Sequence, residues 1–363
     1  QSWSEFVGRI VSHNAILLFL RSYKMPIVAQ SENFFSKKEW GQQLAESLRS
    51  STELLAALDL QEDDFPDGLS AAKQFPVLVP RSFMERMVKG DPRDPLLLQV
   101  LPQGTEEQLH PRFTADPLGE QDTNVTAGVI HKYHGRVLLL AASGCAVNCR
   151  YCFRRHFPYD DNRLSRTQWQ SALSYIAADS SISEVILSGG DPLMLQDAHL
   201  AELVERIADI KHVQRLRIHS RLPVVIAERL TDQLTAVLTG SRLRSSLVLH
   251  VNHPNELSAE HEQRLAKLRQ AGVTLLNQTV LLKGVNDSAQ VLVELSEQLF
   301  NHHLLPYYLH VLDRVQGAQH FDVPSAQAYA LYQQMLAQLP GYLVPKLVRE
   351  EAGQPHKTPL HAF

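Results

Sequence analysis

Six short apolar runs alternate with six helix-like segments in the larger, second part of this 363-residue chain, with a step of about thirty residues. The apolar runs, which predict strands, cover residues 137–142, 184–188, 215–219, 246–251, 273–280 and 306–312. The helix-like segments cover residues 167–178, 199–210, 228–238, 260–271, 289–300 and 325–339. Such alternation is typical of right-handed βαβ units around a parallel sheet. It predicts an α/β fold, either a partial barrel or a doubly wound open sheet.

The part of the chain before this alternation has a different character. Helical patterns cover residues 36–60 and 80–90, whereas residues 91–130 are rich in Pro, Asp and Gly and predict a loop-rich lead-in. The apolar run at residues 15–20 is too short to span a bilayer and lacks a small-residue cleavage site. We set the segment that contains it apart from the fold, with Met25 as a candidate natural start.

Four regions are therefore expected. They are a non-native or disordered extension at residues 1–30, a helical and loop-rich region at 31–130, an α/β core at 131–340 and a C-terminal segment at 341–363. The net charge of -4 gives no reason to expect nucleic-acid binding by a basic surface, so a small-molecule substrate is the default. Nothing suggests an oxidising compartment, and we expect a cytoplasmic protein.

All three cysteines of the chain, Cys145, Cys149 and Cys152, fall within eight consecutive residues. Three thiolates are one short of the four ligands of a Cys₄ cluster or of a structural zinc site. The loop therefore indicates a metal centre with one open coordination position, where a substrate can bind. A zinc site completed by a histidine is the alternative, although zinc motifs usually pair two Cys-x-x-Cys-like clips.

The spacing Cys-x-x-x-Cys-x-x-Cys resembles the signature of the radical S-adenosylmethionine (SAM) enzymes. The resemblance implies that these cysteines hold a [4Fe–4S] cluster whose fourth iron binds the amino and carboxylate groups of SAM. It also favours the barrel, a partial (β/α)6 TIM-like radical SAM barrel. Gly189, Gly190 and Asp191 follow the second predicted strand and match the glycine-rich stretch that contacts SAM, and His250 is implied to lie beside it.

Further motifs resemble the lysine 2,3-aminomutase family. They are residues 276–287, residues 306–310 and the terminal Lys357-Thr-Pro. A lysine in a Gly- and Pro-containing loop is by itself usually a solvated surface residue. In this context the resemblance implies that Lys357 forms a Schiff base with pyridoxal 5′-phosphate (PLP), in a C-terminal PLP-lysine segment. It also aligns further residues with PLP contacts, namely Tyr133, Arg136 and Gln278.

The resemblance assigns three residues to the substrate. Arg154 matches the arginine that pairs with the α-carboxylate of lysine, and Asp313 matches one carboxylate that grips the distal ammonium. Glu350 stands where the longer family members have a second aspartate, so its side chain is one methylene longer. Two anions at the distal end argue for a cationic substrate and against glutamate.

Motifs at residues 150–159, 217–223 and 341–346 bring the chain closest to the short branch that makes (R)-β-lysine for elongation factor P. The implied activity is isomerisation of L-lysine to (R)-β-lysine through a PLP external aldimine. The implied partners are a flavodoxin- or ferredoxin-like electron donor, elongation factor P and its lysyl ligase. The alternatives are an aminomutase acting on arginine or glutamate, and a non-catalytic iron-sulfur or zinc protein.

Overall fold

The computed structural model describes residues 39–65, 68–73, 75–120, 123–158 and 166–360, and these residues form one compact unit. The expectations for residues 1–30, including the start at Met25, lie outside the described residues. No helix within the described ranges is long and apolar enough to cross a membrane.

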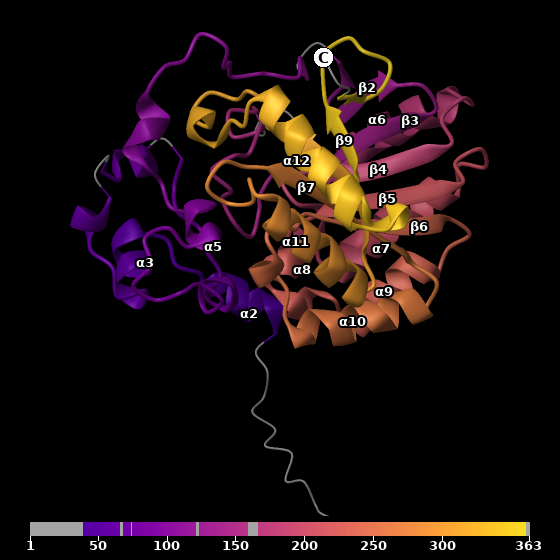
Figure 1. Ribbon diagram of the computed structural model, residues 1–363. Coiled ribbons are helices and arrows are strands. Elements are labelled where there is room, and N and C mark those ends of the chain that lie inside the picture. Colours follow the sequence, from indigo (N-terminus) through magenta and orange to yellow (C-terminus); the bar gives the residue numbers. More distant parts are fainter. Residues whose placement is uncertain (1–38, 66–67, 74, 121–122, 159–165, 361–363) are drawn as a thin grey trace, which may run out of the picture. The chain divides into compact units, whose positions relative to one another are not determined.

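The core of the fold is a parallel sheet whose strands lie in chain order (Figure 1). Its strands are β3 (Arg136–Ala142), β4 (Glu184–Gly189), β5 (Arg215–Ser220), β6 (Arg244–Leu249), β7 (Thr274–Leu281), β8 (Leu305–Val311) and β9 (Lys346–Arg349). The first six confirm the six predicted strands to within two residues at each end. Each of them pairs in parallel with the next along the chain.

A helix follows each of the first six parallel strands. These helices are α6 (Arg166–Ala178), α7 (Asp197–Ala208), α9 (Asp232–Thr239), α10 (Ala259–Gln270), α11 (Ala289–Asn301) and α12 (Ser325–Gln338). The strands lie side by side in the same order as in the chain, so each connection leads to the next strand on the same side. When all of these connections are right-handed, every helix lies on the same face of the sheet. A doubly wound sheet would reverse direction at a switch point. The strand order therefore selects the partial barrel and confirms the predicted fold class.

Apolar side chains at helical spacing attach these helices to the sheet. In α7, Leu200, Leu203, Val204 and Ile207 are all buried, and they pack in the same core as strand residues such as Leu216. Burying a side chain of this size stabilises the fold by roughly 1.5–3 kcal/mol relative to leaving it exposed. The barrel is thereby a stiff support for the loops at the carboxyl ends of its strands.

Short antiparallel strands extend the parallel sheet at both edges. Strands β1 (Asn124–Thr126) and β2 (Val129–Tyr133) precede β3, and β10 (Thr358–Pro359) pairs with β9. The pattern of residues 91–130 predicts loop where β1 and β2 lie, since strands this short and irregular give little alternation. The pairing of β10 with β9 sets Thr358 against Arg349, and the hairpin between them carries both Glu350 and Lys357.

The helical prediction for residues 36–60 is wrong in one respect. Residues 36–38 lie outside the described residues. Residues 39–60 form two short helices, α2 (Trp40–Ala45) and α3 (Ser51–Ala57), because Leu48 pairs with Val79 in a β-bridge and the Ser50 side chain accepts a hydrogen bond from the Glu53 amide to start α3. The predicted helix at residues 80–90 shortens to one turn, α4 (Arg81–Met84). Two more single turns are α5 (Pro95–Leu98) and α8 (Leu222–Val225).

Candidate active site

A cavity of about 570 Å³ opens where the carboxyl ends of the parallel strands meet. Ligands bind at this end of the sheet in barrel folds. Every site residue predicted from the sequence lines this cavity: Tyr133, Arg136, Cys145, Cys149, Cys152, Arg154, Gly189, Gly190, Asp191, His250, Gln278, Asp313, Glu350 and Lys357. The structure therefore brings together residues that are more than 200 positions apart in the sequence. Their individual roles stay predictions.

The cysteine loop after β3 is fixed by contacts that involve no cysteine sulfur. The amide of Asn148 donates to Leu78 O (3.1 Å), and that of Arg150 donates to Gln99 O (2.8 Å). The Arg150 side chain is wholly buried and binds both carboxylate oxygens of Glu106, at 2.9 and 2.6 Å. The backbone of the loop is thus held in place by the N-terminal region.

The three thiols are free and partly exposed to the cavity. Burial raises the pKa of Cys145 well above its usual value and that of Cys152 to about 11, in each case helped by the neighbouring thiols. Binding of metal must therefore release protons from these thiols. Within the described ranges, no three His, Cys, Asp or Glu side chains converge as ligands of one ion.

Gly189 and Gly190 bring β4 against the start of the cysteine loop. The φ angle of Gly189 is +122°, and a Cβ there would lie 2.5 Å from Ala142 O. A Cβ on Gly190 would overlap the carbonyl group of Gly144. The amide of Gly190 donates to Ala142 O and that of Asp191 to Gly144 O, both at 2.8 Å. The glycines are thus required for packing on the cysteine loop, whatever they contact in the cavity.

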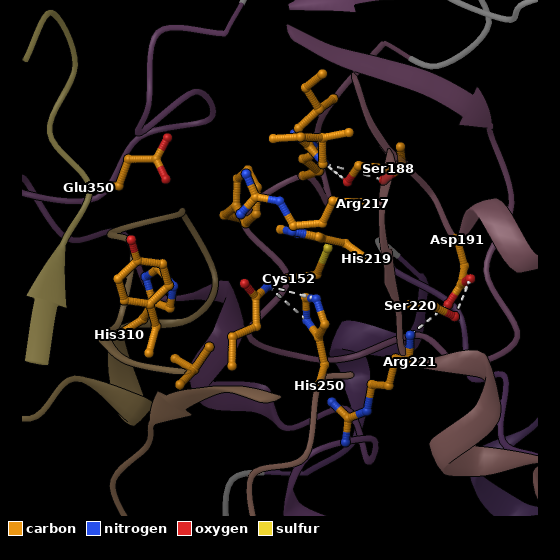
Figure 2. Close-up of a pocket in the computed structure, with 18 of the residues that line it drawn as sticks. Cys152, Ser188, Asp191, Arg217, His219, Ser220, Arg221, His250, His310 and Glu350 are labelled. Atoms are coloured by element: carbon orange, nitrogen blue, oxygen red, sulfur yellow. Dashed lines mark hydrogen bonds between the residues drawn. The ribbon is translucent and has the colours of Figure 1, made fainter. Parts of the chain in front are cut away.

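The Asp191 carboxylate ties β4 to the end of β5. It accepts hydrogen bonds from Ser220 Oγ (2.7 Å) and from the amides of Leu193, Arg221 and Leu222 at 3.0, 2.8 and 2.8 Å. Figure 2 shows Asp191, Ser220 and Arg221 together on one side of the cavity. With four donors on two oxygens, the carboxylate positions the loops around the predicted SAM site.

Arg154 is paired with a carboxylate that the sequence prediction did not include. Its Nε and Nη2 donate to the two oxygens of Glu120 at 2.7 and 2.9 Å, and its Nη1 donates to Ser188 Oγ at 3.1 Å. Both charged side chains are nearly fully buried. The bidentate edge of the guanidinium is therefore occupied, and the Nη1 edge is the one directed at Ser188.

The charges continue from Glu120 to the C-terminal hairpin. Lys132 Nζ lies 3.2 Å from Glu120 Oε1 and 3.1 Å from Glu350 Oε1, and Lys357 Nζ donates to the other Glu350 oxygen. Burial would raise the pKa of Glu350, but the two ammonium groups outweigh it and hold that pKa below its ordinary value. Arg154, Glu120, Lys132, Glu350 and Lys357 thus form one row of alternating charges.

Asp313 follows β8 and belongs to the same wall. Burial and the Glu350 carboxylate raise its pKa to about 7, although Lys357 and Lys132 act in the opposite direction. At neutral pH this carboxyl group is therefore close to half-protonated. An additional cation between Asp313 and Glu350 would favour its ionised form.

Three histidines, His219 on β5, His250 directly after β6 and His310 on β8, face the cavity as neutral rings. Burial lowers the pKa of His250 to about 3 and the pKa values of His219 and His310 well below the ordinary range. Gln278 Nε2 lies 2.6 Å from His250 Nε2. The Nε2 atoms of His219 and His310 are buried and have no hydrogen-bond partner among the described residues.

Two of the predicted PLP contacts, Tyr133 and Arg136, lie against each other, with Tyr133 close to Glu350 of the C-terminal hairpin, whereas Gln278 lies beside His250. The Arg136 guanidinium lies over the Tyr133 ring at 4.7 Å, and Lys357 Nζ lies 5.8 Å from the centre of the Tyr308 ring. Arg217 Nε is buried without a partner in the described part of the chain. The amine of Lys357 suits the aldehyde of PLP, and the guanidinium groups of Arg136 and Arg217 suit its phosphate, because arginine binds oxyanions with a planar pair of donors.

The cavity residues missed from the sequence are mainly Glu120, Lys132 and Arg221. Glu120 lies in the loop-rich stretch, where periodicity carries no information. Lys132 stands next to a predicted residue, and Arg221 is part of a motif used for the resemblance. The sequence shows that these three residues are charged. It does not show that they are buried in the cavity, because their ion-pair partners are distant in the sequence.

A sheet of sequential parallel strands with three thiols at its carboxyl edge defines the radical SAM class of enzymes. Residues 140–295 match the model of the Radical SAM superfamily. The chain is 49% identical to the L-lysine 2,3-aminomutase of Haemophilus influenzae, over 92% of this chain and 99% of that protein. It is 52% identical to the L-lysine 2,3-aminomutase of Escherichia coli, over 90% of this chain and 95% of that protein.

The corresponding protein of Buchnera aphidicola, also an L-lysine 2,3-aminomutase, is 43% identical over 88% of this chain and 95% of that protein. The chain therefore belongs to the L-lysine 2,3-aminomutase family. Membership confirms the predicted family, the predicted enzyme class of an isomerase, and the three cofactors: a [4Fe–4S] cluster, SAM and PLP.

Proposed function

We propose that this chain converts L-lysine to (R)-β-lysine. The observation that carries the proposal is the shared cavity, in which Lys357 and the three-cysteine loop face the same space. Figure 2 shows Cys152 near the middle of this space, with Glu350 on one side and Asp191 on the other. The names of the most similar relatives support the same substrate.

The charges of the cavity suit a molecule with an anionic and a cationic end. At one end, the Nη1 edge of Arg154 can exchange Ser188 Oγ for a substrate carboxylate while Glu120 holds the other edge. At the other end, Asp313 and Glu350 offer two carboxyl groups to the distal ammonium. Lysine carries both of these charges, whereas glutamate would place a third carboxylate beside Asp313 and Glu350.

The Lys357 ammonium must lose a proton to solvent and leave Glu350 before its nitrogen can react with an aldehyde, because an ammonium group has no free electron pair. Lys132 stays on Glu350 Oε1 during this exchange and holds the carboxylate in place. The oxygen that Lys357 leaves, Oε2, then accepts the substrate ammonium. The site therefore replaces one cation with another without leaving the buried carboxylate unpaired.

When bound, the cluster with SAM supplies a carbon-centred radical, and PLP supplies a π-system for the migrating amino group. The protein fixes the position of the substrate and keeps water out. The neutral states of His219, His250 and His310 help to position the substrate, because these rings add no cation that would compete with the substrate ammonium for the acidic residues.

We propose further that the product is used to modify elongation factor P through a separate ligase, in the cytoplasm, and that a flavodoxin- or ferredoxin-like protein supplies the electron. The support is the resemblance at residues 150–159, 217–223 and 341–346.

Anaerobic incubation of the reconstituted enzyme with L-lysine, L-arginine or L-glutamate tests the substrate. We expect β-lysine of R configuration from lysine alone. A β-amino product from arginine or glutamate but not from lysine would contradict the proposal. Lys357→Ala should abolish turnover and the absorption of protein-bound PLP while keeping the iron-sulfur absorption. Retention of both absorptions in this variant would overturn the assignment of Lys357.

A further inference from the structure

A buried arginine at the edge of the cavity lies against the cysteine loop. Arg221 follows β5, and its Nη1 donates a hydrogen bond of 3.1 Å to Cys149 Sγ. Its Nη2 donates to Gln99 Oε1 at 2.8 Å and to Glu256 Oε2 at 3.2 Å. The guanidinium is therefore bound on one side to a thiol and on the other to an amide and a carboxylate.

The position of Arg221 is determined by more than these polar contacts. Its backbone amide is held by Asp191, and its guanidinium packs against Tyr151 and Phe83, with ring centres at 5.4 and 5.7 Å. The side chain of Arg221 is 7% exposed. A cation that is held this firmly beside a sulfur acts on the charge of that sulfur in a medium of low dielectric constant.

We propose that Arg221 sets the reduction potential of the cluster, as a positioning residue that acts through Cys149. The inference rests on the family's cluster being bound by Cys149, but not on lysine being the substrate. Reduction adds one electron to the cluster, from a low-potential one-electron donor, and makes or breaks no bond. The added negative charge is spread over the iron and sulfur atoms, so a positive donor on Cys149 Sγ stabilises the reduced form more than the oxidised form.

Glu256 moderates this effect. Its carboxylate is wholly buried and takes hydrogen bonds from the amides of Asn252 and His253 at 3.0 and 3.1 Å as well as from Arg221. The negative charge of Glu256 opposes the charge of Arg221 at the cluster. Removing the charge of Arg221 and removing the charge of Glu256 should therefore move the reduction potential of the cluster in opposite directions.

Reductive titration with titanium(III) citrate, followed by the EPR signal of the reduced cluster without SAM, measures this effect. We expect Arg221→Gln to shift the midpoint to more negative potential, Glu256→Gln to shift it to more positive potential, and Arg221→Lys to fall between Arg221→Gln and the unaltered protein. Arg229→Gln is the control. Arg229 is also wholly buried, but it donates to Leu193 O and Leu195 O and does not line the cavity, so its loss should leave the potential unchanged.

Unchanged midpoints in both the Arg221→Gln and the Glu256→Gln proteins, or shifts in the same direction, would overturn the inference. If Arg221→Gln fails to fold, Glu256→Gln and Arg221→Lys still give the sign. Product analysis is scored separately on the same samples. Opposite shifts of the midpoint potential without formation of β-lysine would support the role of Arg221 and refute the proposed substrate. Formation of β-lysine with unchanged midpoint potentials would support the substrate and refute the role of Arg221.

Discussion

The wall of the cavity that carries the cysteines and the wall that carries Lys357 are held by different kinds of interaction. At the cysteine loop, backbone hydrogen bonds, close glycine contacts and the wholly buried Arg150–Glu106 pair fix the chain. At the C-terminal hairpin, strand β10 has only two residues, and Lys357 is held mainly by a carboxylate that also binds Lys132.

The difference matches what each wall has to do. A cluster with three separate thiolate bonds needs ligands whose spacing does not change, and rigid backbone contacts provide that spacing. The amine of Lys357 has to change partners, and an ion pair that is open to the cavity can be exchanged for another. Lys132, Glu350 and Lys357 keep 13%, 14% and 21% of their side-chain surface exposed, whereas Arg150 keeps none.

The rigid wall is tested most severely by Gly190→Val. The new side chain would overlap the Gly144 carbonyl, so we expect the cysteine loop to move and the iron content after reconstitution to fall severalfold, with a matching loss of activity. Gly144→Ala is the matched control on the same loop, since a Cβ there would meet nothing within 4 Å. Normal iron content in Gly190→Val would show that the loop is not held by this contact.

The row of alternating charges that leads from Arg154 to Lys357 is tested by Glu120→Gln. This change leaves Arg154 without its carboxylate in a buried position, and we expect the free energy of unfolding to fall by about 3–5 kcal/mol. Lys267→Gln breaks an ion pair whose side chains are 65% and 87% exposed, and it should cost less than about 1 kcal/mol. Urea denaturation of the unloaded proteins measures both. Equal effects would mean that the row of charges contributes no more than a surface pair.

A smaller effect is expected from the pH dependence of Asp313. Its pKa is about 7 in the folded protein against 3.8 for the unperturbed group, so the folded state favours the proton. The stability that comes from this preference is complete below about pH 4 and is lost as the pH rises through 7. We expect Asp313→Asn, which carries no titrating group, to gain about 3–4 kcal/mol in unfolding free energy relative to the unaltered protein between pH 4 and pH 8. A constant difference across this range would refute the raised pKa.

The sequence is informative where the repeat is long and where motifs are local. The six strands and six helices were predictable because each pattern extends over at least five residues, and the cysteine spacing is contained in one loop. Strands β1, β9 and β10 were not, since two to four residues show no reliable period, and β2 begins in the stretch that was predicted as loop. The pairing of Arg154 with Glu120 was also hidden, because a buried ion pair depends on the distance between two loops and neither loop has a pattern of its own.

The cysteine loop and Lys357 face one cavity, so a substrate bound at Lys357 should be reached by the radical formed at the cluster. Following deuterium from the substrate tests this most directly. The reconstituted enzyme is reduced anaerobically with SAM and L-lysine that carries two deuterium atoms at C3, and the SAM is recovered and analysed by mass spectrometry. We expect deuterium at the 5′ carbon of the adenosyl group, together with β-lysine. SAM cleavage that proceeds without any deuterium in the adenosyl group would mean that the lysine at Lys357 and the cluster at the cysteines do not meet.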